Sequence, residues 1–171
     1  AFPSVSHDFL KTCLQYLGMP RKAMNFIHAM YDCNRCVVRV HGEDFPGFCM
    51  LGGVRQGCPL SPLLFAVCVD ILLRMICSVL PDCEIKAFAD DIGTVVTDWW
   101  THGPVLQKIF AEFACISNLC LNIDKTVCIP LWPKGIIDIQ KSIDTHIPAW
   151  KRLAIAGKGT YLDFVIGPDK N

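Results

Sequence analysis

The sequence has little charge and no surplus of either sign. Charged residues make up 19% of its 171 residues, and sixteen Lys and Arg balance sixteen Asp and Glu, so the formal net charge is zero. Because affinity for a nucleic-acid backbone comes mainly from Lys and Arg, the overall charge does not favour such a partner. Hydrophobic residues make up 52% of the chain. This fraction excludes a disordered segment, and the length suits one folded domain.

The sequence also lacks an initiator Met, and no basic stretch leads into an apolar run after Ala1. A signal peptide is therefore not expected, and the chain reads as a fragment of a longer protein. One apolar stretch, residues 59–80, is long enough to cross a membrane. Asp70 and Arg74 lie in its middle, where they would be costly in lipid, so a buried amphipathic helix is expected instead.

A regular disulfide spacing is missing too. The eleven cysteines are odd in number and scattered from Cys13 to Cys128, unlike the framework of a small secreted domain. They are expected to be reduced and buried, in an intracellular compartment (nucleus or cytoplasm) of a protein that is not secreted. Cys33 and Cys36 form a lone CxxC motif. A structural zinc site needs a second pair of ligands, so these cysteines are interpreted as small apolar core residues.

Apolar spacing predicts two helices at the start of the chain. Ser6 is a candidate N-cap for a helix that runs to about Leu17 and ends at Gly18. Pro20 suits the first position of a second helix, which continues to about Asp32. The chain is therefore expected to begin with a helical pair.

A hairpin and a long helix are expected next. The β-prone runs 36–40 and 45–51 are joined by turn residues at 41–44. The Ser-Pro step at 61–62 supplies an N-cap followed by Pro at the first helical position, and this helix should run to about Leu80.

Helices and strands also alternate in the second half. The expected elements are strands at 85–89 and 92–97, a helix at 104–117, a strand-like return at 121–131, a short helix at 136–143 and a last strand at 161–166. The inward face of the helix at 104–117 is expected to comprise Val105, Ile109, Phe110, Phe113 and Ile116. Together these patterns predict an α+β fold, an antiparallel sheet with helices on one face.

Two adjacent carboxylates, Asp90 and Asp91, stand at the expected tip of a hairpin between two apolar runs. Adjacent carboxylates repel each other, and a divalent cation would relieve this repulsion. Mg²⁺ prefers hard oxygen ligands and binds through one or two carboxylates together with substrate phosphates, an arrangement typical of two-metal phosphoryl transfer. An ordinary solvated acidic turn is the simpler interpretation of the pair alone, so the wider sequence has to decide.

Five segments, in order, resemble motifs of the reverse transcriptases of non-LTR retrotransposons. They are the tail of the first catalytic motif at 1–7, the second motif at 53–65, the aromatic-x-Asp-Asp motif at 88–91, a Lys-bearing motif at 121–126 and the closing Tyr-Leu-Gly strand at 161–167. The segment 53–65 is the most specific match, and five motifs in one order make chance a poor explanation.

The resemblance covers essentially the whole chain and implies an incomplete reverse transcriptase domain over residues 1–171. The implied fold is α+β, a right-hand polymerase palm with a ferredoxin-like antiparallel sheet backed by helices, with part of the fingers and without the thumb. The implied reaction is RNA-directed DNA synthesis, with an RNA template, a DNA primer and dNTP as partners. The remainder of the parent polyprotein (upstream fingers, thumb and an endonuclease) would be a further partner, and no membrane is expected.

The resemblance also implies roles for Asp90, Asp91 and Lys125. The two aspartates would be catalytic and would bind two Mg²⁺ ions, with Mn²⁺ as an alternative. Lys125 would be catalytic as a cation or proton donor near the departing pyrophosphate. A lone Lys is more often a solvated surface charge, and this remains the simpler interpretation of Lys125 on its own.

Four further residues are implied to bind substrate. Phe2 matches the position whose ring lies beneath the incoming sugar and leaves no space for a 2′-hydroxyl. Gln56 and Gly57 would position template and nucleotide, and Arg55 would touch phosphate. Without the resemblance, Phe2 would be read as a core aromatic, Arg55 as an exposed charge and the other two as a loop before a helix.

The chain leaves out one residue of the family's catalytic set and departs from the family pattern at two positions, which keeps alternatives open. The other metal-binding Asp of the family would precede Ala1, so these 171 residues alone are expected to have little or no polymerase activity. Pro3 replaces the usual Asp after Ala-Phe and should alter strand pairing, and Asp163 replaces a Gly, placing a charge in a tight position.

These departures favour a non-catalytic nucleic-acid-binding remnant of a decayed element as the main alternative. A group II intron maturase, an RNA-templated RNA polymerase and a metal–thiol redox protein are the other candidates. Phe2 argues against RNA synthesis.

Overall fold

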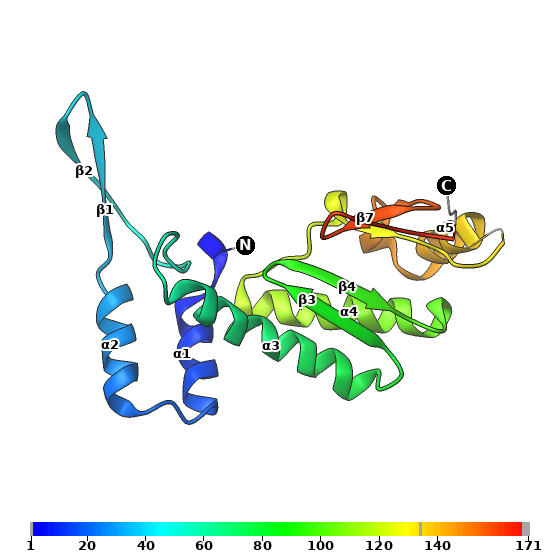
Figure 1. Ribbon diagram of the computed structural model, residues 1–171, viewed down its shortest axis with the longest axis horizontal. Coiled ribbons are helices and arrows are strands. Elements are labelled where there is room, and N and C mark those ends of the chain that lie inside the picture. Colours follow the sequence, from blue (N-terminus) through cyan, green and yellow to red (C-terminus); the bar gives the residue numbers. More distant parts are fainter. Residues whose placement is uncertain (1, 134, 169–171) are drawn as a thin grey trace. The chain divides into compact units, whose positions relative to one another are not determined.

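The computed structural model describes residues 2–133 and 135–168, in which helices alternate with short hairpins (Figure 1). The contacts divide the chain into two units. The first comprises Ala1–Ile71 with Cys115–Leu119, and the second comprises Leu72–Ala114 with Cys120–Asn171.

The first unit contains the predicted helical pair, α1 (His7–Tyr16) and α2 (Arg21–Tyr31). The Ser6 hydroxyl accepts a hydrogen bond from the Phe9 amide at 3.3 Å, so the predicted cap is confirmed. Pro20 lies just before α2 rather than inside its first turn. Apolar side chains at helical spacing are buried on both helices: Phe9, Leu10, Cys13, Leu14, Met24, Ile27 and Tyr31.

Strands β1 (Arg35–Val40) and β2 (Glu43–Cys49) form the first hairpin, which extends away from α1 and α2 (Figure 1). Its turn has two residues, so the expected four-residue turn was wrong. His41 and Gly42 both adopt left-handed φ angles, 51° and 86°, and such a pair closes a hairpin that matches the twist of the strands.

The β1–β2 hairpin is exposed on both faces. Arg39 and Asp44 pair across it through two hydrogen bonds of 2.6 and 2.9 Å. The apolar side chains that remain exposed on it are Val37, Val38, Val40, Phe45 and Phe48. Within unit 1, this hairpin therefore contributes little to the core.

The long helix α3 (Ser61–Val79) is amphipathic, as expected. Its buried side chains recur at helical spacing: Leu64, Phe65, Cys68, Val69, Leu72 and Ile76. Its length and hydropathy would suffice to cross a membrane, yet a third of the span is already buried in the protein. The Ser61 hydroxyl is buried and has no hydrogen-bond partner among the described residues, so the predicted cap at Ser61 was wrong.

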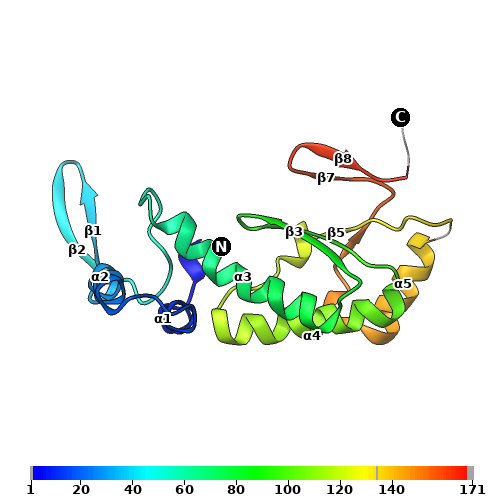
Figure 2. The same ribbon diagram turned by 60° about the horizontal axis from the view of Figure 1, so that its bottom comes forward.

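The second unit begins with the C-terminal part of α3 and the hairpin of β3 (Glu84–Phe88) and β4 (Asp91–Val95). Both views show this hairpin lying over α3 and α4 (Trp99–Ser117) (Figures 1 and 2). The two strands lie close to the predicted ranges 85–89 and 92–97.

Helix α4 begins at Trp99, five residues before the predicted start at Pro104. The Asp98 carboxylate accepts hydrogen bonds from the Trp100 amide at 3.0 Å and the Thr101 hydroxyl at 2.6 Å. The bond from Thr101, followed by weaker bonds from the backbone, lowers the pKa of Asp98. Asp98 thus caps a helix that continues through Pro104, and the predicted start was wrong.

The buried face of α4 is rotated from the predicted one. Ile109 and Phe113 are buried, as expected, but Leu106 and Ser117 complete the stripe. Ile116 is 51% exposed, so its assignment to the inward face was wrong.

The segment 121–131 is not one strand. It contains the 3₁₀ turn η2 (Ile123–Lys125) and the two-residue strand β5 (Val127–Cys128), which pairs in parallel with β6 (Ala154–Ile155). The short helix expected at 136–143 is confirmed as α5 (Gly135–His146), followed by the 3₁₀ turn η3 (Pro148–Trp150).

The expected last strand at 161–166 is a third tight hairpin, β7 (Gly159–Tyr161) and β8 (Phe164–Ile166). Its turn residues Leu162 and Asp163 have φ angles of 48° and 67°. Glycine suits such a turn, and Asp tolerates it. Asp163 is exposed, so the expectation that its charge enters a tight place was wrong.

The described strands form four separate two-stranded sheets, three antiparallel and one parallel. The α+β class with antiparallel hairpins is confirmed. The single antiparallel sheet is not observed among these residues.

Candidate functional site

The acidic pair lies at the tip of the β3–β4 hairpin. Phe88 pairs directly with Asp91, which leaves Ala89 and Asp90 as a two-residue turn. Ala89 has a φ angle of 53°, in the left-handed region that usually belongs to glycine at the first position of such a turn. The paired strands therefore fix two neighbouring carboxylates at one end of a short ribbon.

Both carboxylates are exposed, and their charges are not compensated. Within the described ranges, neither Asp90 nor Asp91 forms a salt bridge or a side-chain hydrogen bond. The described residues also contain no group of three His, Cys, Asp or Glu side chains arranged around a metal position. The donors present fit Mg²⁺, which binds through one or two carboxylates and completes its shell with water and substrate oxygens.

Tyr161 connects the closing hairpin to the acidic one. A Cβ atom added to Gly93 would lie 3.5 Å from two ring carbons of Tyr161. The Tyr161 hydroxyl donates to the carbonyl of Lys86 at 3.4 Å, and Lys86 is paired with Gly93 across the hairpin. The two hairpins thus meet through a side chain rather than by joining their backbones. The only available signal was a Gly inside a β-branched strand, which often marks a close approach.

Lys125 lies in the second unit, at the end of η2. Asn122 caps this turn, since its side-chain oxygen accepts from the Lys125 amide at 3.2 Å and its carbonyl accepts from the Thr126 hydroxyl at 2.8 Å. The neighbouring Asp124 pairs with Arg152 at 3.3 Å. The Lys125 side chain is exposed, and among the described residues it has no ion pair with Asp90 or Asp91.

Phe2 lies in the first unit, in the 3₁₀ turn η1 (Phe2–Ser4). Its half-buried ring packs on Phe65 of α3 with 4.6 Å between ring centroids. The Phe2 carbonyl accepts from the Val54 amide at 2.9 Å. Because residues 2–4 form a turn, Pro3 interrupts no strand there.

The start of the second motif runs beside this segment. The Gly53 amide donates to the Val5 carbonyl at 2.7 Å, and Ser6 and Gly52 form a β-bridge. Gly53 has a φ angle of 87°, and a Cβ atom there would lie 2.6 Å from the Pro3 carbonyl oxygen. Only glycine fits this position. The first and second motifs are thus in direct contact within unit 1.

The predicted substrate-binding residues 55–57 follow directly. The Arg55 guanidinium donates to the Asn34 side-chain oxygen at 2.8 Å. Gln56 and Gly57 are exposed in the turn before α3, and Gly57 has a φ angle of 81° with open space around it. The sequence did not single out Asn34, nor His7, whose Nε2 lies 2.8 Å from the Gly53 carbonyl oxygen.

All eleven cysteines are free, but most are not buried. Only Cys13, Cys68 and Cys83 are buried, so the expectation of a general core role was wrong. Burial raises the pKa of the Cys68 thiol to about 12 and that of Cys128 to about 11. Both thiols are therefore protonated at neutral pH.

Residues 1–144 match a protein-family model described as reverse transcriptase (RNA-dependent DNA polymerase). The chain is 30% identical over 151 residues to the Retrovirus-related Pol polyprotein from type-1 retrotransposable element R2 of Popillia japonica, covering 83% of this chain and 21% of that protein. It is 30% identical over 165 residues to the Pol polyprotein from type-2 retrotransposable element R2DM of Drosophila melanogaster, covering 89% and 16%.

A third relative is the Transposon TX1 uncharacterized 149 kDa protein of Xenopus laevis, 29% identical over 176 residues, with 95% of this chain and 13% of that protein covered. The chain thus spans between 13% and 21% of the length of these three relatives. The family model covers most of the chain, including the first four of the five motifs. The chain belongs to the reverse transcriptase family and represents a reverse transcriptase domain of the non-LTR retrotransposon type.

Proposed function

We propose that the chain forms the palm and part of the fingers of an RNA-directed DNA polymerase that adds dNTPs to a primer 3′-hydroxyl. The observation that carries this proposal is the pair Asp90 and Asp91, exposed and uncompensated at a tight hairpin tip. In a chain of the reverse transcriptase family, such a pair is better explained as a cation site than as an ordinary turn.

Asp90 and Asp91 would hold Mg²⁺, with Mn²⁺ as an alternative, because their oxygens are the hard ligands these cations require. When bound, the ions would neutralise phosphate charge and stabilise the attacking and leaving oxygens. The contribution of the chain is geometry. The paired strands and the two-residue turn hold the carboxylates in place, which limits reorganisation during the reaction.

The substrate-binding residues have separate tasks. The Phe2 ring is supported by Phe65 and remains half exposed, so it can lie against a deoxyribose and leave no space for a 2′-hydroxyl. Gln56 and Gly57 are free to approach template and nucleotide. Arg55 is tied to Asn34, which favours an indirect role. Lys125 would stabilise the charge on departing pyrophosphate.

The partners would be an RNA template, a DNA primer, a dNTP and the remainder of a polyprotein. The matched segments make up only 13% to 21% of the length of the three relatives. Basic surfaces on such further segments would complement a chain whose own net charge is zero.

Primer extension by a polyprotein that contains this chain tests the proposal. Asp90→Asn keeps the size of the side chain and removes its charge, so extension on an RNA template with Mg²⁺ should fall at least about 100-fold. Asp82→Asn is the matched control, because Asp82 is also exposed and lies in the turn before β3. Equal activity of Asp90→Asn and Asp82→Asn would refute the assignment.

The same experiment separates the enzyme from a non-catalytic remnant. A remnant would bind the template and primer without extending the primer, and Asp90→Asn would change nothing. Pro3 lies in a turn and Asp163 is exposed in another, so neither departure breaks a strand or buries a charge.

A further inference from the structure

We propose that His7 is a positioning residue for the loop 53–57, which it holds through the Gly53 carbonyl, and that this contact governs how the loop binds template and nucleotide. The second part rests on the function proposed above. The first part concerns the folded chain alone.

The hydrogen bond has a defined direction. The His7 Nε2 atom lies 2.8 Å from the Gly53 carbonyl oxygen. A carbonyl can only accept, so Nε2 must carry the hydrogen. Gly53 itself is buried, and its amide is bonded to the Val5 carbonyl at 2.7 Å. Loss of the imidazole would leave a buried carbonyl without this donor, and the local backbone would have to rearrange to find another.

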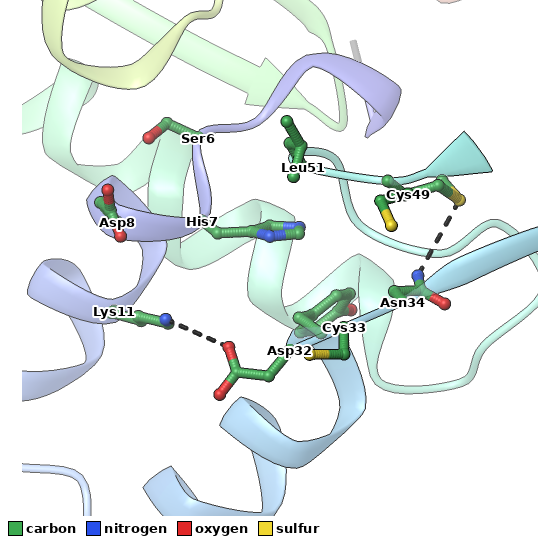
Figure 3. Close-up of a pocket in the computed structure, with 11 residues that line it drawn as sticks. Ser6, His7, Asp8, Lys11, Asp32, Cys33, Asn34, Cys49 and Leu51 are labelled. Carbon is green, nitrogen blue, oxygen red and sulfur yellow. Dashed lines mark hydrogen bonds and ion pairs between the residues drawn. The ribbon is translucent and has the colours of Figure 1, made fainter.

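The imidazole is held on a rigid support. His7 is the first residue of α1, and its ring packs on that of Tyr31 from α2 with 5.1 Å between centroids. His7 lines a pocket of about 360 Å³. Figure 3 shows its ring extending into this pocket from the start of α1. The helical pair thus reaches the second motif through one side chain.

A second contact fixes the loop two residues later. The Arg55 guanidinium donates to the Asn34 oxygen at 2.8 Å. Asn34 is held in turn, because its carbonyl accepts from the Met50 amide at 2.8 Å and its side-chain nitrogen contacts the Met50 sulfur at 3.9 Å. Contacts at Gly53 and Arg55 therefore restrict the loop just before Gln56.

These contacts explain how His7, which touches no substrate, can affect substrate binding. Gln56 and Gly57 are exposed, so their position depends on the anchored residues before them. His7 therefore acts through Gly53. Its loss should weaken nucleotide binding more than it slows the chemical step.

Two substitutions at His7 separate the hydrogen bond from the ring. His7→Phe keeps a ring against Tyr31 and removes the donor, whereas His7→Gln removes the ring and supplies an amide donor. His28→Phe is the control, because His28 lies on α2 and its buried Nε2 has no partner among the described residues.

Hydrogen exchange of the 171-residue chain, followed by mass spectrometry, reports on the loop directly. In His7→Phe, the amides of residues 53–55 should exchange about five- to tenfold faster, the effect of losing one hydrogen bond. In His7→Gln and His28→Phe they should exchange at the wild-type rate. Steady-state extension by a polyprotein carrying His7→Phe should show the KM for dNTP raised by a similar factor, with kcat changed less than about twofold.

Each outcome decides a separate part. Equal exchange rates in all variants would overturn the proposed contact whatever the enzyme does. Faster exchange with an unchanged KM would overturn the positioning role and leave the polymerase function intact. A wild-type polyprotein that extends no primer would overturn the proposed function and the positioning role. Amide exchange of residues 53–55 would still test the hydrogen bond between His7 and Gly53. If His7→Phe does not fold, His7→Gln provides the test. Faster exchange of the amides of residues 53–55 in His7→Gln, or a raised KM for dNTP, would contradict the proposal.

Discussion

Ala89 adopts a backbone conformation that side chains rarely favour. Its φ angle of 53° places it in the left-handed region, which costs a non-glycine residue roughly 1–2 kcal/mol. The neighbouring Asp90 and Asp91 are the proposed metal ligands. Strain of this kind is tolerated where surrounding structure imposes it, and it gives the tip one defined shape. A glycine at position 89 would remove the strain, and it would also let the backbone at the tip adopt more conformations.

Replacing Ala89 tests this interpretation. Ala89→Gly relieves the left-handed φ but adds freedom to the unfolded chain, so the free energy of unfolding should change by less than about 1 kcal/mol. The amides of Asp90 and Asp91 should nevertheless exchange faster, because the tip is less restricted. Chemical denaturation and amide exchange measure the two effects.

Ala87→Gly is the matched control, since Ala87 pairs with Ile92 inside β3 and β4. There, glycine should cost roughly 0.5–1 kcal/mol. If Ala89→Gly lowered the free energy of unfolding as much as Ala87→Gly, Ala89 would not be strained in the folded chain.

The site residues show what a sequence can and cannot predict at this scale. Asp90 and Asp91 were predicted at a hairpin tip because the two β-prone runs that form the hairpin are their direct neighbours in the sequence. His7 bonds to Gly53, 46 positions away, and Tyr161 bonds to Lys86, 75 positions away. Such pairs depend on tertiary packing, and neither residue type indicates its partner.

At the scale of elements, the antiparallel hairpins have turns of the same length. Each of the three antiparallel hairpins in the described part of the chain closes with two residues, at 41–42, 89–90 and 162–163. The first contains Gly42, a recognised turn signal. The third has neither a glycine nor an adjacent acidic pair to mark its turn, so it was predicted as one continuous strand. Pro104 misled the prediction of α4 in a similar way, because the cap at Asp98 lies six residues before α4 was expected to begin.

The contact between the two hairpins of unit 2 gives a further prediction. The ring of Tyr161 lies against Gly93. Gly93→Ala should be tolerated, because the added Cβ would be at an ordinary contact distance of 3.5 Å. Gly93→Val should displace the ring and destabilise the unit by roughly 1–3 kcal/mol, the usual cost of overpacking. Denaturation curves of the two variants measure the difference.

Tyr161→Phe serves as the control for this contact. It removes only the exposed hydrogen bond of 3.4 Å to Lys86, so its stability should stay close to that of the wild type. An equal loss in Gly93→Ala and Gly93→Val would show that the ring does not occupy this space.

At the scale of the whole molecule, helices α3 and α4 belong to both units. The sequence predicted both helices from their apolar spacing, and it predicted the α+β class from the alternation of elements. It did not indicate two units, because a boundary inside a continuous helix leaves no linker in the sequence.

Burial of Cys68 makes stability depend on alkaline pH. Its pKa is about 12 in the folded chain against an ordinary value of 9.0. Below pH 9 both states keep the proton and stability is complete. Between about pH 9 and pH 12 only the unfolded chain releases it, so stability falls by at most roughly 1.4 kcal/mol per pH unit. Urea denaturation at about pH 8 and about pH 10 should show this loss.

Cys68→Ala should flatten the pH dependence, although the smaller side chain lowers stability at every pH. Cys115→Ala is the control, because Cys115 is exposed, and it should keep the slope of the wild type. A slope that is unchanged in Cys68→Ala would mean that other groups cause the alkaline loss.

The β1–β2 hairpin has a practical consequence for anyone who purifies this chain. A two-stranded ribbon with valines and phenylalanines open to water on both sides invites neighbouring molecules to add strands along its edges. Pro46 and the irregular register near Arg35 obstruct part of those edges, but not all. Dilute samples and solubilising fusion partners are therefore the natural choice, so that self-association is not mistaken for binding to nucleic acid.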